Sequence, residues 1–241
     1  MAIEYMGIKE VNGPLVVVDG VEDVSFEEIV ELTVNNSEKK LGQVIAITGK
    51  RAVVQVFEET NNISLTNTRA RFLKTPMMIP LSGEILGRVL DGTGKPIDGL
   101  GPIYPEVKRD INGSAINPVS REYPRNFIQT GISSIDVLMT LIRGQKLPIF
   151  SGNGIPHDQL AAQIVRQAQI SNEENENFAI VFAAMGVKND VASFFRRTFE
   201  ESGALERVVM FLNFSNDPVA ERIITPRAAL TAAEYLAFDK G

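Results

Sequence analysis

The chain has no cysteine and no tryptophan, and its 241 residues include a single histidine. Without cysteine it forms no disulfide, no thiolate metal site and no cysteine nucleophile. One histidine excludes a histidine-rich metal cluster, so we predict no metal site. A Ser-His-Asp triad would have to use His157, and no nucleophile-elbow pattern lies near that residue.

Long apolar runs are also missing. No run approaches the ~18 residues that cross a membrane, and the first residues lack the features of a signal peptide. These absences predict a cytoplasmic protein in which the sequons Asn62-Ile63-Ser64 and Asn112-Gly113-Ser114 stay unused. The net charge of −6 and the pI near 5.0 argue against nucleic-acid binding by general electrostatics.

The chain does have apolar content, since 44% of its residues are hydrophobic, which is enough for one large or two small domains. Short runs rich in Val and Ile, separated by turn signals, fill residues 8–73. The expected strands are 14–18, 29–34, 42–47 and 52–57. Such regular spacing predicts a small β-barrel over residues 1–75. Residues 73–80, with prolines at 76 and 80, are predicted to be a linker.

Residues 82–127 are rich in loops, and from residue 128 strand and helix patterns alternate, which predicts an α/β domain with a mainly parallel sheet over residues 76–241. The expected strands are 85–91, 147–150, 178–184 and 208–214. Helices are expected over 135–142, from Pro156, after Asn189-Asp190, and after Thr225-Pro226, the last carrying Leu230, Ala233 and Leu236. The stripe of Val191, Phe194, Phe195 and Phe199 on the third helix is predicted to be core.

The segment after the expected strand 147–150 occupies the place of a phosphate-binding loop. A working loop follows G-x-x-x-x-G-K-[ST], in which backbone amides cradle phosphate, the lysine reaches the terminal phosphates and the hydroxyl holds magnesium. In this register Ser151 replaces the first glycine, Pro156 the second, His157 the lysine and Asp158 the hydroxyl residue. The degenerate phosphate loop comprises Ser151, Gly152, Asn153, Gly154, Ile155, Pro156, His157 and Asp158.

These replacements weaken nucleotide binding. A hydrogen bond to a charged group contributes about 1.5–3 kcal/mol, so loss of the lysine alone weakens triphosphate binding about ten- to a hundred-fold. Pro156 also removes an amide donor. Two interpretations stay open from the loop alone. It is either a relative of a nucleotide site that does not hydrolyse ATP itself, or a plain strand-to-helix turn in which Gly152 and Gly154 are turn residues.

Two further features carry alternatives. The pair Gly92-x-Gly94 favours a hairpin turn over a phosphate site. Arg222 and Arg227 are candidate interface residues that would stabilise phosphate charge in a neighbouring subunit, as arginine fingers do. The other interpretation is structural, because arginines near helix ends more often pair with acids or cap carbonyls.

Several segments, in order along the chain, carry a family resemblance. They are Gly13-Pro14-Leu15, Gln55-Val56-Phe57-Glu58, Leu86-Gly87-Arg88-Val89, and residues 92–96, 127–133, 143–152, 181–186, 216–223 and 225–236. Through them the chain resembles the B-type subunits of the V/A-type rotary ATPases and ATP synthases over nearly its whole length.

The resemblance implies an N-terminal β-barrel followed by a P-loop (RecA-like) nucleotide-binding-type domain. In that family three A-type and three B-type subunits alternate in a ring around a central stalk, with a peripheral stalk beside it, on the cytoplasmic face of a membrane. The A-type subunit hydrolyses ATP at its interface with B. The chain is therefore expected to be a non-catalytic subunit that meets the membrane only through the complex and binds no nucleic acid. ATP or ADP with magnesium is the cofactor left open, held weakly or at the interface with A.

The resemblance also gives a meaning to Val187. In catalytic relatives the strand after the phosphate loop ends in Gly-Glu-Arg, and the glutamate positions the attacking water. The matching residues here are Gly186, Val187 and Lys188. Valine neither accepts nor orients a proton, so the base is expected to be lost together with the lysine.

Length separates the chain from this family, whose members are roughly twice as long. The resemblance therefore implies a truncated domain without the rest of the sheet, the trans-acting arginine and the C-terminal helical domain. It predicts an exposed apolar sheet edge and a tendency to associate. The alternative functions are a self-sufficient P-loop NTPase and a nucleic-acid translocase with an atypical loop. The missing lysine and Val187 count against the first, and the acidic charge against the second.

Overall fold

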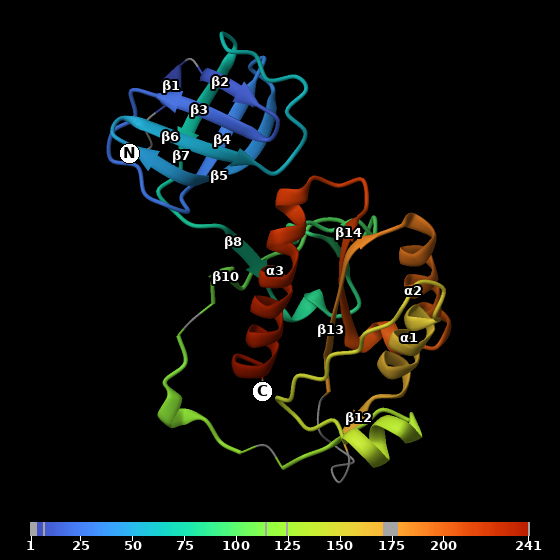
Figure 1. Cartoon of the computed structure of the whole chain (residues 1–241). Coiled ribbons are helices and arrows are strands. Elements are labelled where there is room, and N and C mark those ends of the chain that lie inside the picture. The colour runs from blue at the N-terminus through green and yellow to red at the C-terminus, as the bar shows by residue number, and fades with distance from the viewer. Residues whose placement is uncertain (1–3, 7, 114, 124, 171–177, 241) are drawn as a thin grey trace.

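A computed structural model describes residues 4–6, 8–113, 115–123, 125–170 and 178–240. A curled antiparallel sheet forms the N-terminal part, and an α/β layer structure follows it (Figure 1). Within the described residues, no helix combines the length and apolarity that a membrane span requires.

The N-terminal sheet has seven strands in the order β1-β7-β4-β5-β6-β3-β2. They are β1 Glu4–Met6, β2 Ile8–Asn12, β3 Leu15–Asp19, β4 Ile29–Val34, β5 Glu38–Thr48, β6 Arg51–Val56 and β7 Thr68–Phe72. The four strands expected from the sequence are confirmed as β3 to β6. Alternate residues such as Val16, Val18, Val30 and Leu32 point into one core and are fully buried, because successive side chains of a strand face opposite sides.

The prediction that residues 73–80 only link two domains is wrong. Residues Met78–Leu81 form β8, which pairs antiparallel with β10, Val107–Asp110. Ile79 and Leu81 are fully buried. Pro80 is tolerated because the ribbon has only two strands, so its missing N–H faces no second neighbour.

The second sheet is parallel, in the order β13-β14-β9. Its strands are Ile180–Val187 (β13), Val208–Phe214 (β14) and Val89–Asp91 (β9). The strands expected at 178–184 and 208–214 are confirmed. Of the strand expected at 85–91 only the last part forms, because Gly83–Ile85 make a 3-10 turn and Gly87 has a left-handed φ of 78°.

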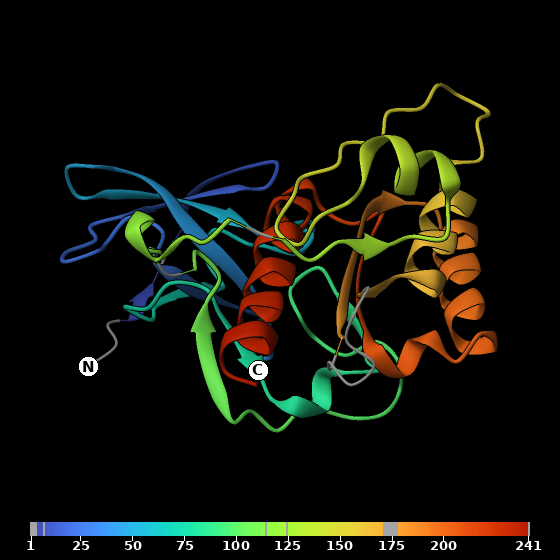
Figure 2. The same ribbon diagram turned by 90° about the horizontal axis from the view of Figure 1, so that it is seen from below.

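Helices cover both faces of this sheet. Figure 2 shows α3 (Val219–Phe238) on one side of β13 and β14, and α1 (His157–Gln167) with α2 (Asn189–Glu201) on the other. The central strand β14 divides its side chains accordingly. Phe211 packs in the cluster with α3, whereas Met210 packs with the aromatic residues of α2. Phe195 and Phe199 are buried there, so the predicted core role of the phenylalanine stripe is confirmed.

Helix α3 begins earlier than the sequence suggested. It starts at Val219 and runs through Pro226, which removes one backbone hydrogen bond and costs about 3 kcal/mol in a helix interior. Burial of Ala220 and Ile224 before the proline, and of Ala228 after it, holds the helix together. Leu230 is exposed, while Ala232 and Tyr235 supply the buried face of the C-terminal half.

Two elements expected before the degenerate loop are not formed as predicted. The segment 135–142 makes only a short π-type turn, Ile135–Met139. Residues 147–150 are not a strand, because no described strand pairs with their backbone, and Phe150 is 92% exposed. The remaining short elements are β11 (Ile128–Gln129), paired with β12 (Gln169–Ile170), and the 3-10 turns Pro118–Ser120 and Ala204–Arg207.

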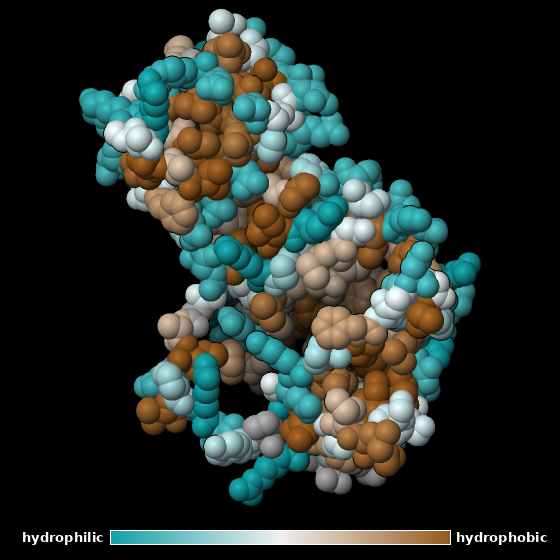
Figure 3. All heavy atoms as spheres, viewed as in Figure 1, coloured by the Kyte–Doolittle hydropathy of each residue, from teal (hydrophilic) through white to brown (hydrophobic). Residues whose placement is uncertain are grey.

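The expected exposed apolar sheet edge is present in the part of the chain that the structure describes. Strand β13 has β14 as its only strand neighbour there, and most of its side chains are half-buried. Val137, Leu138 and Ile155 are also exposed. Figure 3 shows apolar surface on the barrel and on the α/β part. Association through this surface stays a prediction.

Candidate functional site: the degenerate phosphate loop and the edge of the parallel sheet

The degenerate phosphate loop leads directly into α1. Gly152 and Gly154 are exposed, and Gly154 takes a left-handed φ of 83°, which glycine adopts without strain. The N–H of Ile155 donates to the Gly152 carbonyl at 3.4 Å. The two glycines therefore build a turn, as the structural interpretation of the loop requires.

Pro156 turns the backbone back on itself. Its φ of −76° and ψ of 57° are those of an inverse γ-turn, and the N–H of His157 donates to the Ile155 carbonyl at 2.8 Å. Proline has no N–H, so two consecutive positions of the loop offer no amide to a ligand: one amide hydrogen is absent and the other is bound within the chain.

The side chains of the loop do not replace the missing charge. His157 Nδ1 lies 3.0 Å from the Ile155 carbonyl oxygen, and since a carbonyl only accepts, this nitrogen carries the hydrogen. His157 Nε2 lies 3.4 Å from Asp158 Oδ1. Asp158 is a carboxylate in the first turn of α1, where it interacts favourably with the helix dipole but would repel phosphate. No lysine or arginine occurs between Ser151 and Asp158.

Val187 ends β13 at the carboxyl edge of the parallel sheet, where ligands bind in open α/β folds. Its carbonyl accepts from the N–H of Ser215 at 2.8 Å. The neighbouring Gly186 donates its N–H to Asn213 Oδ1 at 3.1 Å. Position 187 thus presents an aliphatic side chain and satisfied backbone groups, and offers no side-chain proton acceptor.

Arg222 belongs to this edge through contacts within the chain. Its Nε donates to Asn213 Oδ1 at 3.2 Å, and Asn213 is fully buried. Its guanidinium lies against Gly186, so closely that a Cβ on that glycine would be 3.1 Å from Arg222 Cζ. Gly186 also has a φ of 66°, which disfavours any other residue. These contacts support the structural interpretation of Arg222.

Arg227 lies elsewhere, at the contact between the barrel and the α/β part. Its Nη1 donates to Asn112 Oδ1 at 3.0 Å and lies 3.9 Å from Glu27 Oε1. Asn112 Nδ2 in turn donates to Glu27 Oε2 at 3.4 Å. The contacts of Arg222, Arg227 and the loop residues do not overlap, so the structure gives them three separate surroundings.

The Gly92-x-Gly94 pair forms a hairpin turn, as predicted. The N–H of Gly94 donates to the Asp91 carbonyl at 3.0 Å, and the N–H of Asp91 donates to the Lys95 carbonyl at 2.8 Å. The turn packs on α3, where a Cβ on Gly92 would lie 2.3 Å from Thr225 Oγ1. Close packing, not phosphate, requires glycine at position 92.

Glu221 is a residue that the sequence did not single out. Its Oε1 accepts from the N–H of Gly92 at 3.0 Å, which ties α3 to the hairpin. Burial, and to a lesser extent the nearby carboxylates of Asp217 and Asp91, together raise the pKa of Glu221 to about 7. The signal that could have found it is its place in the segment 216–223, three to four residues after Asp217 and Pro218. Among the described residues, no group of three or more acidic or histidine side chains is arranged to hold a metal ion.

Comparison with known proteins bears on both halves of the chain. A family model described as the ATP synthase alpha/beta family, nucleotide-binding domain, matches residues 131–241. A model described as the ATP synthase alpha/beta family, beta-barrel domain, matches residues 8–74. The chain belongs to the ATP synthase alpha/beta family. The barrel and the nucleotide-binding domain expected from the sequence are thereby confirmed.

Curated relatives that are about 60% identical to the chain are named as beta chains of V-type ATP synthases. The chain is 60% identical over 238 residues, 99% of its length, to the "V-type ATP synthase beta chain" of Halothermothrix orenii. It is 58% identical to the "V-type ATP synthase beta chain 2" of Clostridium tetani over its whole length, and 59% identical to the Thermotoga neapolitana "V-type ATP synthase beta chain" over 99% of its length. The chain spans about half the length of these curated relatives, covering 51%, 53% and 51% of them. These matches give no support to a nucleic-acid translocase or to an unrelated P-loop NTPase.

Family membership places the site residues in one domain. The degenerate phosphate loop, Val187 and both arginines all lie within residues 131–241, the part matched as the nucleotide-binding domain. Glu27, the partner of Arg227, lies within the part matched as the β-barrel. Arg227 therefore joins the two domains of this family within one chain.

Replacing Arg227 by alanine is expected to lower the free energy of unfolding by less than about 1 kcal/mol, because exposed ion pairs contribute little. The side chains of Arg227 and Glu27 are 46% and 37% exposed. Chemical denaturation of the two proteins measures the difference. Arg197→Ala is the matched control, since its pair with Glu201 lies on the outside of α2 and joins no domains. A loss of several kcal/mol for Arg227→Ala alone would contradict the weak, exposed contact described here.

Proposed function

We propose that the chain is part of a non-catalytic B-type subunit of a V/A-type ion-translocating rotary ATPase or ATP synthase. The observation that carries the proposal is the γ-turn at Pro156 in a loop without a lysine. The relatives named V-type ATP synthase beta chain supply the context. Val187, which stands in place of a proton acceptor, adds a second and independent loss.

On this proposal the nucleotide-binding domain is a wall of the catalytic interface. A catalytic A-type subunit would supply the intact phosphate loop, and three such subunits would alternate with three copies of the B type. The barrels would contact one another in a ring, and the central and peripheral stalks would complete the assembly on the cytoplasmic face of the membrane.

The residues present do not fit magnesium-ATP by themselves. The loop offers the exposed backbone of Gly152, Asn153 and Gly154 and the amides of α1 that follow His157, but no side-chain cation. Asp158 adds a negative charge where the magnesium-binding hydroxyl would be. ATP or ADP would therefore bind weakly, or only where a neighbouring subunit completes the site.

A thermal unfolding scan with and without excess magnesium-ATP tests this directly. A ligand that binds the native state stabilises it by RT ln(1 + [L]/Kd), so weak binding leaves the midpoint almost unchanged. We expect no significant shift for the natural chain and no release of phosphate from ATP. Saturable ATP hydrolysis by the chain alone would overturn the proposal.

A rebuilt loop provides the positive counterpart. The variant Ser151→Gly/Pro156→Gly/His157→Lys/Asp158→Thr restores both glycines, the lysine and the hydroxyl. We expect it to bind magnesium-ATP at least ten- to a hundred-fold more tightly than the natural chain, since a hydrogen bond to a charged group alone is worth about that factor. The matched control carries the other three changes and keeps His157. Equal affinity of the two variants would show that the lysine position does not face phosphate.

A further inference from the structure

A hollow of about 600 Å³ lies where the barrel meets the α/β part. It is bounded by the chain between β7 and β8, by β10, and by the turn after β9. The side chains that line it are mainly apolar and include Ile29, Leu41, Leu73, Met77, Met78 and Ile103. Small-molecule sites have volumes of roughly 300–1,000 Å³ and occur preferentially between domains. Size, lining and position all match such a site.

The floor of this junction hollow is part of the hydrophobic core. Ile29, Met77 and Ile103 are buried and belong to the core cluster that includes Phe211. Backbone hydrogen bonds hold both walls: the N–H of Leu73 donates to the Ile29 carbonyl at 2.9 Å, and the N–H of Ile111 donates to the Met77 carbonyl at 3.0 Å. Only Met78, at 37% exposed, gives the rim an adaptable apolar side chain.

The charge of the lining has one sign. Lys95 and Lys108 contribute to it, and no aspartate or glutamate does. Lys95 Nζ lies 3.8 Å from Glu58 Oε1, which is too far for a hydrogen bond, and the other oxygen of Glu58 accepts from the N–H of Leu41 at 2.8 Å. Within the described residues, Lys108 makes no side-chain hydrogen bond or ion pair. Both ammonium groups thus retain donors for a ligand.

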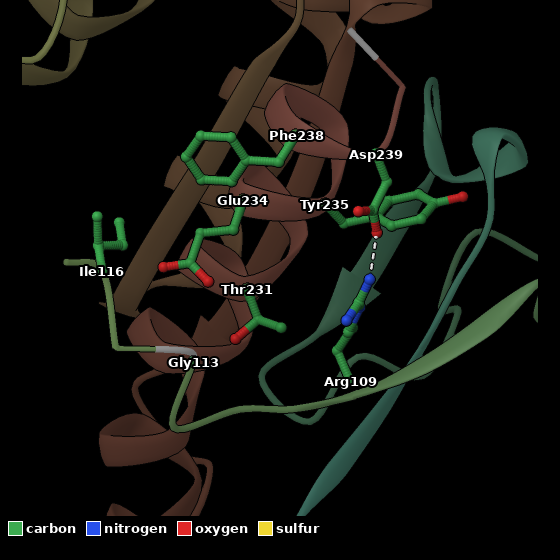
Figure 4. Close-up of a pocket in the computed structure, with 8 residues that line it drawn as sticks. All are labelled: Arg109, Gly113, Ile116, Thr231, Glu234, Tyr235, Phe238 and Asp239. Carbon is green, nitrogen blue, oxygen red and sulfur yellow. Dashed lines mark hydrogen bonds and ion pairs between the residues drawn. The ribbon is translucent and has the colours of Figure 1, made fainter. Parts of the chain in front are cut away.

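A second hollow, of about 190 Å³, lacks this combination of size, apolar lining and unpaired positive charge. Figure 4 shows it between α3 and the residues Arg109, Gly113 and Ile116. There Arg109 Nη2 lies 2.7 Å from Asp239 Oδ2, and Glu234 adds a further negative charge. It is smaller and has no unpaired cation among its lining residues, so it lacks the combination found at the junction.

We propose that the junction hollow binds an amphipathic monoanion, a molecule with an apolar chain or ring and a single carboxylate. The apolar part would cover the leucine, isoleucine and methionine side chains, and the carboxylate would pair with Lys95 and Lys108. Because the walls come from both domains, the ligand would also hold the barrel against the α/β part. The proposal concerns a site remote from the degenerate loop and does not depend on the proposed function.

Methionine methyl groups provide a direct test. The chain has seven methionines, two of which line the hollow. Decanoate, added to the full chain below its micelle concentration, should shift the 13C-methyl NMR signals of Met77 and Met78. Met6, Met139 and Met185 are exposed elsewhere and should not move. Met→Leu variants assign the signals. Equal shifts at all exposed methionines would show non-specific amphiphile binding and overturn the proposal, as would no shift at Met77 and Met78.

Charge selectivity is the second requirement. Lys95→Ala/Lys108→Ala should weaken decanoate binding about tenfold or more, since charge-assisted hydrogen bonds are lost. The matched control Lys146→Ala/Lys188→Ala removes two lysines that do not line the hollow and should leave binding unchanged. Decanol should bind the natural chain more weakly than decanoate. Equal binding of decanol and decanoate, with no effect of the lysine variant, would refute the anion site.

Discussion

Replacing Asp98 by asparagine is expected to lower the free energy of unfolding by about 3–5 kcal/mol, because it leaves a buried arginine without its counter-charge. The side chains of Arg88 and Asp98 are only 11% and 4% exposed. Arg88 Nε donates to Asp98 Oδ2 at 2.6 Å, and Arg88 Nη2 donates to Asp98 Oδ1 at 3.0 Å. This bidentate pair is the most buried acid–base pair among the described ion pairs.

The pair also organises the start of β9. Asp98 accepts from the backbone N–H of Val89 at 3.1 Å and of Leu100 at 3.0 Å, while Arg88 donates to the Gly101 carbonyl. The backbone carbonyl of Arg88 accepts a hydrogen bond from the N–H of Met210 at 3.0 Å, which joins the start of β9 to the central strand β14. Loss of the carboxylate therefore weakens the hairpin and the edge of the parallel sheet together.

Urea denaturation of the natural chain and the variant measures the effect. Asp19→Asn is the control, because its pair with Lys9 is about 44% exposed and its loss should matter far less. The double variant Arg88→Met/Asp98→Leu removes both charges and should recover much of the lost stability. If Asp98→Asn lowered the free energy of unfolding no more than Asp19→Asn does, the pair of Arg88 and Asp98 would not be buried in solution.

The lowered pKa of Asp98 sets a lower pH limit for the stability that this residue contributes. The Arg88 guanidinium holds the pKa of this carboxyl well below its usual range. A carboxyl whose pKa is lower in the folded state stabilises the fold above its unfolded pKa, near 4, and loses that contribution as the pH falls further. The stability difference between the natural chain and Asp98→Asn should accordingly shrink in strong acid.

Glu221→Gln is expected to stabilise the protein at pH 8 and to have little effect near pH 4. Burial raises the pKa of Glu221 from 4.5 to about 7, with Asp217 and Asp91 as further causes. A shift of this size corresponds to about 3 kcal/mol at most, and partial contact with water reduces it to an order of 1–2 kcal/mol. Glutamine keeps an oxygen that can accept from the N–H of Gly92.

The direction in pH follows from the raised pKa. In the folded chain Glu221 keeps its proton up to about pH 7, whereas in the unfolded chain it loses the proton near pH 4.5. Its contribution is therefore fully present below pH 4.5 and is lost as the pH rises to about 7. The natural chain should lose stability over this window through Glu221, and Glu221→Gln should not.

Thermal unfolding at several pH values between 4 and 8 measures the window. Glu201→Gln serves as the control, since Glu201 lies on the outside of α2 and is 72% exposed. If Glu221→Gln raised the midpoint of thermal unfolding equally at pH 4 and pH 8, titration of this carboxyl would be excluded as the cause. No gain at pH 8 would show that Glu221 is well solvated.

The sequence patterns predicted an element correctly where its burial could be recognised from the residues of that segment alone. Strand β14, at Val208–Phe214, was predicted to the residue because both of its faces are buried, so it is apolar throughout. Phe195 and Phe199 could be assigned to the core because α2 has one apolar face. Residues 147–150 have equally apolar side chains, yet no described strand pairs with them, and pairing is not visible in composition.

The same division runs through the site. That the loop has no lysine, that Asp158 carries no hydroxyl and that position 187 is a valine are matters of residue identity, and the sequence alone showed them. The second lost amide is not, because the hydrogen bond from His157 to Ile155 depends on the backbone angles of Pro156. Pro226 misled the prediction of α3, since only packing shows that a helix continues through it.

The sequence by itself determined the family resemblance, the order of barrel and nucleotide-binding domain, and the absence of lysine and arginine from residues 151–158. These properties reside in residue types and their spacing, which exist before folding. Only the tertiary structure decided that Arg222 binds Asn213, that Arg227 joins Asn112 and Glu27, and that Glu221 is half-buried beside Gly92. Arg222 meets a neighbour nine positions away, but Arg227 and Glu221 meet residues more than a hundred positions distant. Charge and proton affinity there are set by burial and by neighbours that the fold alone brings together.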